Sequence, residues 1–283
     1  MKEINLLKMK SKEEHTIARI GLGRAGISMP TNHLLDFQLA HAQAQDTVHL
    51  PLDTQTLITD IQSCGGDSDI PNQTLALHCI LVHSQVVDRS QYLQRPDLGR
   101  RLNSASVAAL RIHAAVEDEP YDLAIVIVDG LSSFAIQKNT SPLLQQLIQR
   151  VSLQALSKSK VKNDEAGIFR LAPIVVVEQG RVAIGDEVGE LLNAKSVLVF
   201  IGERPGLSSP DSLGLYLTWA PKVGLTDESR NCISNVRPEG LEYSKAVNKV
   251  IYLLSEAHQR QLSGVNLKER TQIIECSLSH KEK

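Results

Sequence analysis

One segment, Ser196–Leu207, constrains the fold more than any other part of the sequence. Its first six residues are apolar except Ser196, and the run stops at Gly202-Glu203-Arg204-Pro205-Gly206. A short, β-branched apolar run bounded by Gly and Pro is typical of a strand buried on both faces, as in a parallel sheet. Open α/β sheets bind ligands at the loops that follow such strands, so Glu203 and Arg204 are candidate binding residues. A surface turn that carries one ion pair is the alternative.

Five other segments have the composition of strands. They are Leu75–His83, Tyr121–Asp129, Leu171–Val177, Leu213–Trp219 and Asn231–Val236. Segments with helical spacing of apolar residues, or with helix-start signals, separate most of them. Strands that alternate with helices over residues 75–260 predict an α/β fold, a Rossmann-like parallel sheet with helices on both faces.

The helices themselves suggest how the chain divides into domains. They are predicted at residues 32–45, 53–62, 96–116, 141–156, 186–192 and 242–261. The first two precede all the strands, and a loop rich in Gly, Asp and Ser follows them at Cys64–Asn72. We therefore expect a small helical N-terminal domain over residues 1–70 and a Rossmann-like domain over residues 71–283.

Composition excludes several classes of function. Lys and Arg total 30 against 32 Asp and Glu, a net charge of −2, so the basic field that nucleic-acid binding needs is missing. No window approaches 18 consecutive apolar residues, and the charged N-terminus lacks the apolar core of a secretory signal. The four cysteines form no C-x-x-C pair, which argues against a zinc site or a disulfide framework. We expect a cytoplasmic protein without a membrane span.

A glycine motif near the N-terminus resembles a dinucleotide-binding fingerprint. Gly21, Gly23 and Gly26 make a literal G-x-G-x-x-G, but the fingerprint requires a helix that opens at the glycines. Pro30 interrupts the segment and the helical pattern begins only at Thr31, too late to point its first turn at a pyrophosphate. A stand-alone nucleotide-binding protein remains an alternative, and an arginine-bearing turn fits the segment better.

Polar side chains gather where the predicted strands end. Asp129 and Ser132 follow one strand, Arg181 follows another, and Glu203 and Arg204 follow a third. Parallel strands end at the same rim of a sheet, which is the expected binding surface. The segment Asp88–Leu102 adds four arginines, which suit carboxylates or phosphates, or else mark a solvated helix start: Arg89, Arg95, Arg100 and Arg101. An anionic or nucleotide-like ligand, or a partner subunit, fits this rim.

No complete catalytic set is recognisable in the sequence. The nucleophile elbow G-x-S-x-G, the Walker A motif and H-E-x-x-H are all missing. Cys232 has no His near it in sequence, and Asp129 suits an arginine partner or a helix cap as well as a base.

Five motifs occur in a fixed order: Thr16–Gly26, Tyr92–Leu102, Val128–Ser132, Gly202–Leu207 and Arg230–Asn235. Together with Ser263–Leu267 they resemble the small (light) subunit of ethanolamine ammonia-lyase, over about residues 16–268. Any one of these motifs is weak, but five in order at the right spacing are highly specific.

The resemblance implies an adenosylcobalamin-dependent lyase that converts ethanolamine to acetaldehyde and ammonia by a radical mechanism. The substrate site would lie in the barrel of a large subunit, so no catalytic and no metal-ligating residue is expected in this chain. The small subunit would pack against the large catalytic subunit and cover part of the corrinoid. The implied assembly is a trimer of paired heterodimers, with no nucleic acid and no membrane.

Three positions match the family's cobalamin contacts: Val182, Glu203 and Cys232. A glutamate can accept a hydrogen bond from a corrin amide, while Val182 and Cys232 can offer apolar and backbone contact. None of the nine histidines has an Asp two residues before it, so the Asp-x-His-x-x-Gly motif that replaces the cofactor's own base is missing. This agrees with the base-on binding that the family implies.

The N-terminus departs from part of the family. Some members carry a longer extension there that is associated with packaging into a bacterial microcompartment, whereas about 15 residues precede the similarity here. We expect a free cytoplasmic enzyme rather than a packaged one. A purely structural subunit, whose strand-end loops only contact a partner, is the third reading of the sequence.

Overall fold

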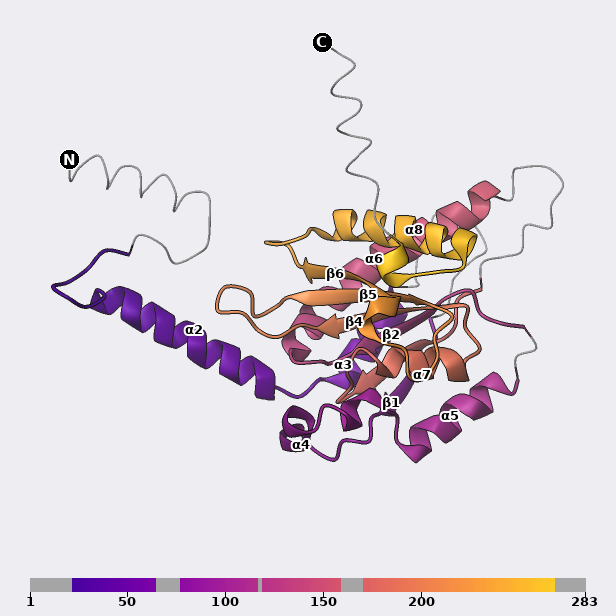
Figure 1. Cartoon of the computed structure of the whole chain (residues 1–283), viewed down its shortest axis with the longest axis horizontal. Coiled ribbons are helices and arrows are strands. Elements are labelled where there is room, and N and C mark those ends of the chain that lie inside the picture. The colour runs from indigo at the N-terminus through magenta and orange to yellow at the C-terminus, as the bar shows by residue number, and fades with distance from the viewer. Residues whose placement is uncertain (1–21, 65–76, 117–118, 159–169, 268–283) are drawn as a thin grey trace, which may run out of the picture.

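A computed structural model of the chain describes residues 22–64, 77–116, 119–158 and 170–267. Its centre is a six-stranded sheet in the order β1-β3-β2-β4-β5-β6 (Figure 1). The strands are β1 Cys79–His83, β2 Ala124–Val128, β3 Ile174–Glu178, β4 Ser196–Gly202, β5 Leu213–Trp219 and β6 Arg230–Val236. Every strand lies within or beside a segment that the apolar runs predict.

Helices surround this sheet. The α-helices are α2 Thr31–His49, α3 Thr54–Ser63, α4 Arg89–Gln94, α5 Ser104–Ala114, α6 Ser133–Lys158, α7 Ile184–Leu191 and α8 Tyr243–Arg260. Three short 3₁₀ turns are η1 Leu98–Arg100, η2 Asp227–Ser229 and η3 Gly264–Asn266. Within these described ranges, no helix is long and apolar enough to cross a membrane.

The sheet is mixed rather than wholly parallel. β1, β3, β2 and β4 run parallel, as predicted, but β5 pairs antiparallel with β4, and β6 antiparallel with β5. The link between β4 and β5 explains the difference, because residues 203–212 contain a turn and no helix. A parallel return needs a crossover of a dozen or more residues, so this short link can only turn the chain back.

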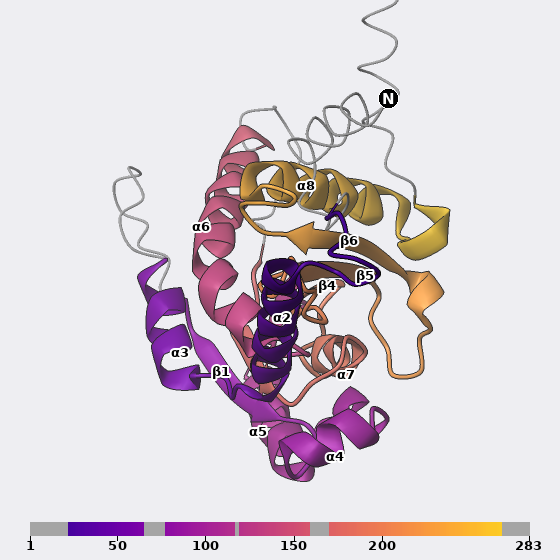
Figure 2. The same ribbon diagram turned by 90° about the vertical axis from the view of Figure 1, so that its left-hand side faces the viewer.

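Both faces of the sheet are covered, which confirms the predicted α/β layering. Ile125 and Ile127 of β2 point to a core formed with α3, α6 and α8. Their neighbours Ala124, Val126 and Val128 point to a second core formed with α5 and α7 (Figure 2). All five residues are buried, as expected for a strand buried on both faces.

Two helix starts differ from the prediction. α6 begins at Ser133, where the Ser132 Oγ accepts a hydrogen bond from the Ala135 N–H at 3.1 Å, and Pro142 lies inside the helix. The helix predicted from Pro96 begins instead at Ser104, capped by Asn103, whose Oδ1 accepts from the Ser106 N–H at 2.8 Å. In both cases a side-chain cap, rather than a proline, fixes the first turn.

The N-terminal helices relate to the sheet in different ways. α2 projects away from it (Figure 1), and Ala40 is the only buried residue of that helix. α3 instead places Leu57 and Ile61 in the core that it shares with α6 and α8. The domain boundary predicted at residue 70 lies outside the described residues.

The glycine motif forms a turn at the start of this region. Gly21 is outside the described residues, whereas Gly23 and Gly26 have φ of 73° and 66°. Ala25 and Ser28 exchange two backbone hydrogen bonds of 2.8 and 3.2 Å across the turn. Because α2 begins only at Thr31, no helix opens at the glycines as a dinucleotide fingerprint requires.

Candidate functional site

A cavity of about 550 Å³ lies at the carboxyl ends of β2, β3 and β4, the rim that the strand order predicts. The residues that line it come from all three strand ends, from α4 and the turn η1, and from β5 and η2. They are Tyr92, Pro96, Arg100, Gly130, Leu131, Arg181, Val182, Ala183, Ile201, Gly202, Glu203, Arg204, Tyr216 and Asp227. One wall of the cavity is apolar and consists of Leu131, Val182, Ala183 and Ile201.

The three predicted contact residues are not equally placed. Val182 and Glu203 both line this cavity, although they are separated by 21 positions in the sequence. Cys232 does not line it. It pairs instead with Tyr216 across β5 and β6, and Tyr216 reaches the cavity. Burial and the neighbouring Cys232 raise the pKa of the Tyr216 hydroxyl, so this group stays protonated at neutral pH.

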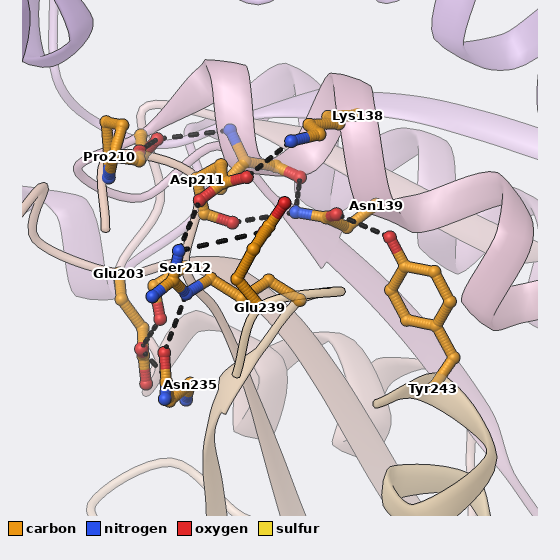
Figure 3. A network of polar contacts seen from close by, with 12 residues as sticks. Lys138, Asn139, Glu203, Pro210, Asp211, Ser212, Asn235, Glu239 and Tyr243 are labelled. Carbon is orange, nitrogen blue, oxygen red and sulfur yellow. Dashed lines mark hydrogen bonds and ion pairs between the residues drawn. The ribbon is translucent and has the colours of Figure 1, made fainter. Parts of the chain in front are cut away.

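Glu203 is held in place by Ser212, just before β5, and by Asn235 of β6. Its Oε2 accepts hydrogen bonds from the Ser212 Oγ and from the Asn235 N–H, the latter at 3.2 Å (Figure 3). A Cβ at Gly214 would lie 2.9 Å from the Glu203 Oε1, so a larger residue there would force the carboxylate out of its observed position. The orientation of the Glu203 side chain is therefore fixed before any ligand binds.

A second layer of polar contacts supports this arrangement (Figure 3). The Asn235 Oδ1 accepts from the Arg237 Nε at 3.0 Å, and the Arg237 guanidinium contacts the buried Asp211 at 3.3 Å. Burial alone would raise the pKa of Asp211, but the Lys138 ammonium, 2.5 Å away, holds it below its ordinary value. Asp211 thereby links the Glu203 loop to α6, which carries Lys138.

Asp129 joins the ends of β2 and β3 beside the cavity. Its Oδ1 accepts from the Gly130 and Gly180 N–H groups at 2.8 and 3.1 Å, and its Oδ2 from the Gln179 N–H at 3.0 Å. The Arg89 guanidinium lies 3.6 Å away. Burial nevertheless raises the pKa of Asp129 to about 6, against the opposing effect of Arg89 and the three amides. Asp129 therefore connects the ends of β2 and β3 and pairs with Arg89, and it does not cap the following helix.

Most of the predicted arginine cluster is structural. Tyr92 is fully buried, and its ring lies between Arg89 and Arg181, with guanidinium carbons 4.5 and 4.0 Å from the ring centroid. The Tyr92 hydroxyl donates to the Gly180 carbonyl at 2.9 Å. Further along, Arg95 pairs with Asp97, and Arg101 with Glu187. Arg100 is the member of the cluster that lines the cavity.

Two glycines let β2 and β4 meet at the cavity wall. A Cβ at Gly202 would overlap the carbonyl oxygen of Ser132 and lie 2.6 Å from that of Asp129. Gly130 has φ of 60°, and a Cβ there would overlap the carbonyl oxygen of Gly202. No other residue type fits this contact, so the two glycines define the shape of the wall.

Sequence reasoning missed Tyr216 and Asp227. Tyr216 alternates with the core-facing Leu215 and Leu217 and carries no signal of its own. Asp227 precedes β6 and is held by Arg230 at 3.0 Å, which in turn forms a buried ion pair with Asp186 of α7. Among the described residues, no group of three or more His, Cys, Asp and Glu could hold a metal ion.

Comparison with known proteins agrees with the motifs. Residues 7–268 match the family described as ethanolamine ammonia-lyase light chain. The ethanolamine ammonia-lyase small subunit of Pseudomonas aeruginosa PAO1 is 55% identical over 258 residues, which cover 91% of this chain and 86% of the relative. The proteins of the same name from Pseudomonas fluorescens SBW25 and Pseudomonas putida W619 are each 52% identical over 91% of this chain, covering 84% and 86% of those relatives.

Proposed function

The chain belongs to the ethanolamine ammonia-lyase light chain family, and we propose that it works as the small subunit of an adenosylcobalamin-dependent lyase that converts ethanolamine to acetaldehyde and ammonia. In this proposal the chain binds part of the base-on cofactor and packs against the large catalytic subunit. It contributes no catalytic residue of its own. The observation that carries the proposal is the strand-end cavity in which Val182 and Glu203 meet.

The lining of the cavity suits the edge of a corrinoid. A corrin ring has an apolar face and a periphery of amide side chains. Val182 and Ile201 offer apolar contact, the fixed Glu203 carboxylate can accept from an amide N–H, and the protonated Tyr216 hydroxyl can donate to an amide oxygen. When bound, the cofactor supplies the radical chemistry, and this chain supplies binding and orientation.

The size of the cavity favours a shared site. A volume of about 550 Å³ is in the range that encloses a drug-sized ligand, and a corrinoid is larger than that. This chain can therefore surround only one edge of the cofactor. We propose that the large subunit provides the remaining wall and, with it, the catalysis, in a trimer of paired heterodimers.

The helix α2 is the surface that we propose faces the large subunit. Its side chains Leu35 and Leu39 are each 58% exposed, and Ile27 in the preceding turn is 98% exposed. Exposed apolar side chains gathered on a projecting element are typical of protein interfaces. The relatives are named small subunits, so a larger partner is the occupant that this surface fits.

The central experiment co-expresses this chain with a cognate large subunit and measures acetaldehyde formed from ethanolamine with added adenosylcobalamin. We expect a stable complex and activity that depends on both chains. A chain that forms no complex and supports no activity would refute the proposal. Nucleotide binding by the isolated chain would then favour the stand-alone alternative.

A variant separates cofactor binding from a purely structural role. Glu203→Ala should weaken cobalamin affinity of the complex by about tenfold, the effect of losing one hydrogen bond to a charged acceptor, while the complex stays intact. Glu239→Ala is the matched control, because that carboxylate belongs to the same polar network but does not line the cavity. Unchanged affinity in Glu203→Ala would indicate that the loop serves only subunit contact.

A further inference from the structure

Among the described residues, two arginines of the cavity have no ion-pair or hydrogen-bond partner. Arg100 and Arg204 both line it, and both are exposed. Within the part of the chain that the structure describes, neither guanidinium forms an ion pair or a hydrogen bond with another residue. Most other arginines nearby are engaged, as the pairs of Arg89, Arg95 and Arg101 show.

The remaining charged groups of the cavity are already committed. Arg181 donates to the Tyr92 carbonyl at 2.9 Å and stacks on the Tyr92 ring. Asp227 forms an ion pair with Arg230, and Glu203 accepts from two protein donors. Three arginines therefore face two carboxylates, and the positive charge that remains available to a ligand is on Arg100 and Arg204.

The backbones that carry these two arginines are fixed although their side chains are free. Arg100 ends the turn η1, where its N–H donates to the Asp97 carbonyl at 3.2 Å, and the preceding Gly99 is closely packed, so a Cβ there would lie 3.0 Å from Arg181. Arg204 lies between Glu203, whose N–H donates to the Ser212 carbonyl at 2.9 Å, and Pro205, which restricts the backbone of the residue before it. A fixed base and an unpaired guanidinium suit capture of an anion.

We propose that Arg100 and Arg204 form an anion subsite for a phosphodiester. This assignment rests on the proposed function. The corrinoid periphery carries neutral amides, and the phosphodiester of the nucleotide tail is its anionic substituent. Guanidinium groups bind phosphate through two parallel N–H donors, and two of them can share the two free oxygens of a phosphodiester. The subsite places the nucleotide tail beside the β4 loop and η1, while Val182 and Glu203 contact the corrin edge.

The test compares two probes that differ by one phosphate. Cobinamide lacks the nucleotide tail, and cobinamide phosphate retains its phosphate group. Equilibrium dialysis with the purified two-subunit complex should show tighter binding of cobinamide phosphate than of cobinamide. Arg100→Gln and Arg204→Gln should each reduce that advantage about tenfold, the effect of one charge-assisted hydrogen bond, and leave cobinamide affinity unchanged within about twofold.

The controls separate the possible failures. Arg95→Gln removes a charge from the same segment, but Arg95 pairs with Asp97 and does not line the cavity, so the phosphate advantage should persist. A wild-type complex that binds both probes equally, or a double variant that keeps the full advantage, overturns the subsite and leaves the proposed function standing. Adenosylcobalamin is dialysed in parallel. A complex that binds it but neither probe overturns the subsite alone, and a complex that binds none of the three refutes the proposed function and this assignment with it.

Discussion

The buried carboxylate of Asp129 makes a sharp prediction about stability and pH. Asp129→Asn replaces the side chain by a neutral group of nearly the same shape. Its Oδ1 can still accept from the Gly130 and Gly180 N–H groups. In the wild type, Asp129 Oδ2 accepts from the Gln179 N–H at 3.0 Å and its negative charge faces Arg89. In the variant, the amide nitrogen of Asn takes the place of Oδ2, so a donor faces the Gln179 N–H and the charge of Arg89 is no longer neutralised. The variant therefore resembles the protonated form of Asp129, which also places a donor at that position.

The magnitude follows from the pKa of Asp129, which burial raises from 3.8 to about 6 in the folded protein. A raised pKa means that the folded state binds the proton more tightly than the unfolded state. The stabilisation by that proton is fully present below pH 4 and is lost as pH rises through 6. Since a tenfold change in a protonation constant is worth about 1.4 kcal/mol, the wild type should lose about 3 kcal/mol between pH 4 and pH 7 through this group.

Urea unfolding at intervals from pH 4.5 to pH 7.5 checks this argument. The stability of Asp129→Asn relative to the wild type should rise with pH, by about 2 kcal/mol over this range. The comparison is needed because burial also raises the pKa of Asp186 to about 6, and Asp186 titrates identically in both proteins. Asp36→Asn, on the exposed part of α2, controls for the loss of one charge.

A relative stability of Asp129→Asn that falls as pH rises would refute this prediction. That outcome would mean that Arg89 and the three backbone amides outweigh burial and hold the pKa of Asp129 below its ordinary value. A difference that does not change with pH would show that the pKa of Asp129 is the same in the folded and unfolded chains. In either case Asp129 would be charged throughout the neutral range, and the strand ends beside the cavity would carry no pH dependence from it.

Two further variants test the packing of the cavity wall and the proposed partner surface. Gly202→Ala should destabilise the fold by about 3 kcal/mol, measured by urea unfolding, because its Cβ would overlap the Ser132 carbonyl oxygen. A loss no larger than about 1 kcal/mol, as expected for Gly23→Ala with its positive φ and open surroundings, would contradict that contact. The double variant Leu35→Ser with Leu39→Ser should weaken capture of the large subunit in size-exclusion chromatography without changing the unfolding curve; undiminished capture would remove α2 from the interface.

Much of the sheet was predictable because its strands are buried on both faces. β2, β3 and β4 read as continuous apolar runs, and the polar residue that ends each run marks the rim. The predicted starts of α5 and α6 are wrong because Pro96 and Pro142 have the pattern of helix starts, while the caps in the structure are Asn103 and Ser132. A single serine or asparagine in a polar stretch is a weaker signal than a proline, although it fixes the first turn.

The candidate site was predictable only where chain order decides it. Arg181 and Glu203 follow parallel strands, so the strand-end rule brings them together, whereas Val182 is named only by the family resemblance. The roles of the four clustered arginines could not be predicted from the sequence, because each role depends on partners that are far away in the chain. Arg89 pairs with Asp129 and Arg101 with Glu187, residues that the folded sheet brings near them. Among the described residues, Arg100 has no such ion-pair partner.

The antiparallel return of β5, which the sequence pattern did not predict, is what completes the site. Because β5 runs against β4, its first residue Leu213 lies beside Gly202, the last residue of β4. Ser212 therefore reaches the same rim, and β6, which runs back along β5, brings Asn235 there as well. A parallel β5 would have started at the opposite rim of the sheet, where the parallel strands begin. Both hydrogen-bond donors to Glu203 would then have been lost. The short β4–β5 link thus both forbids a parallel strand and orients the carboxylate on which the proposed cofactor contact depends.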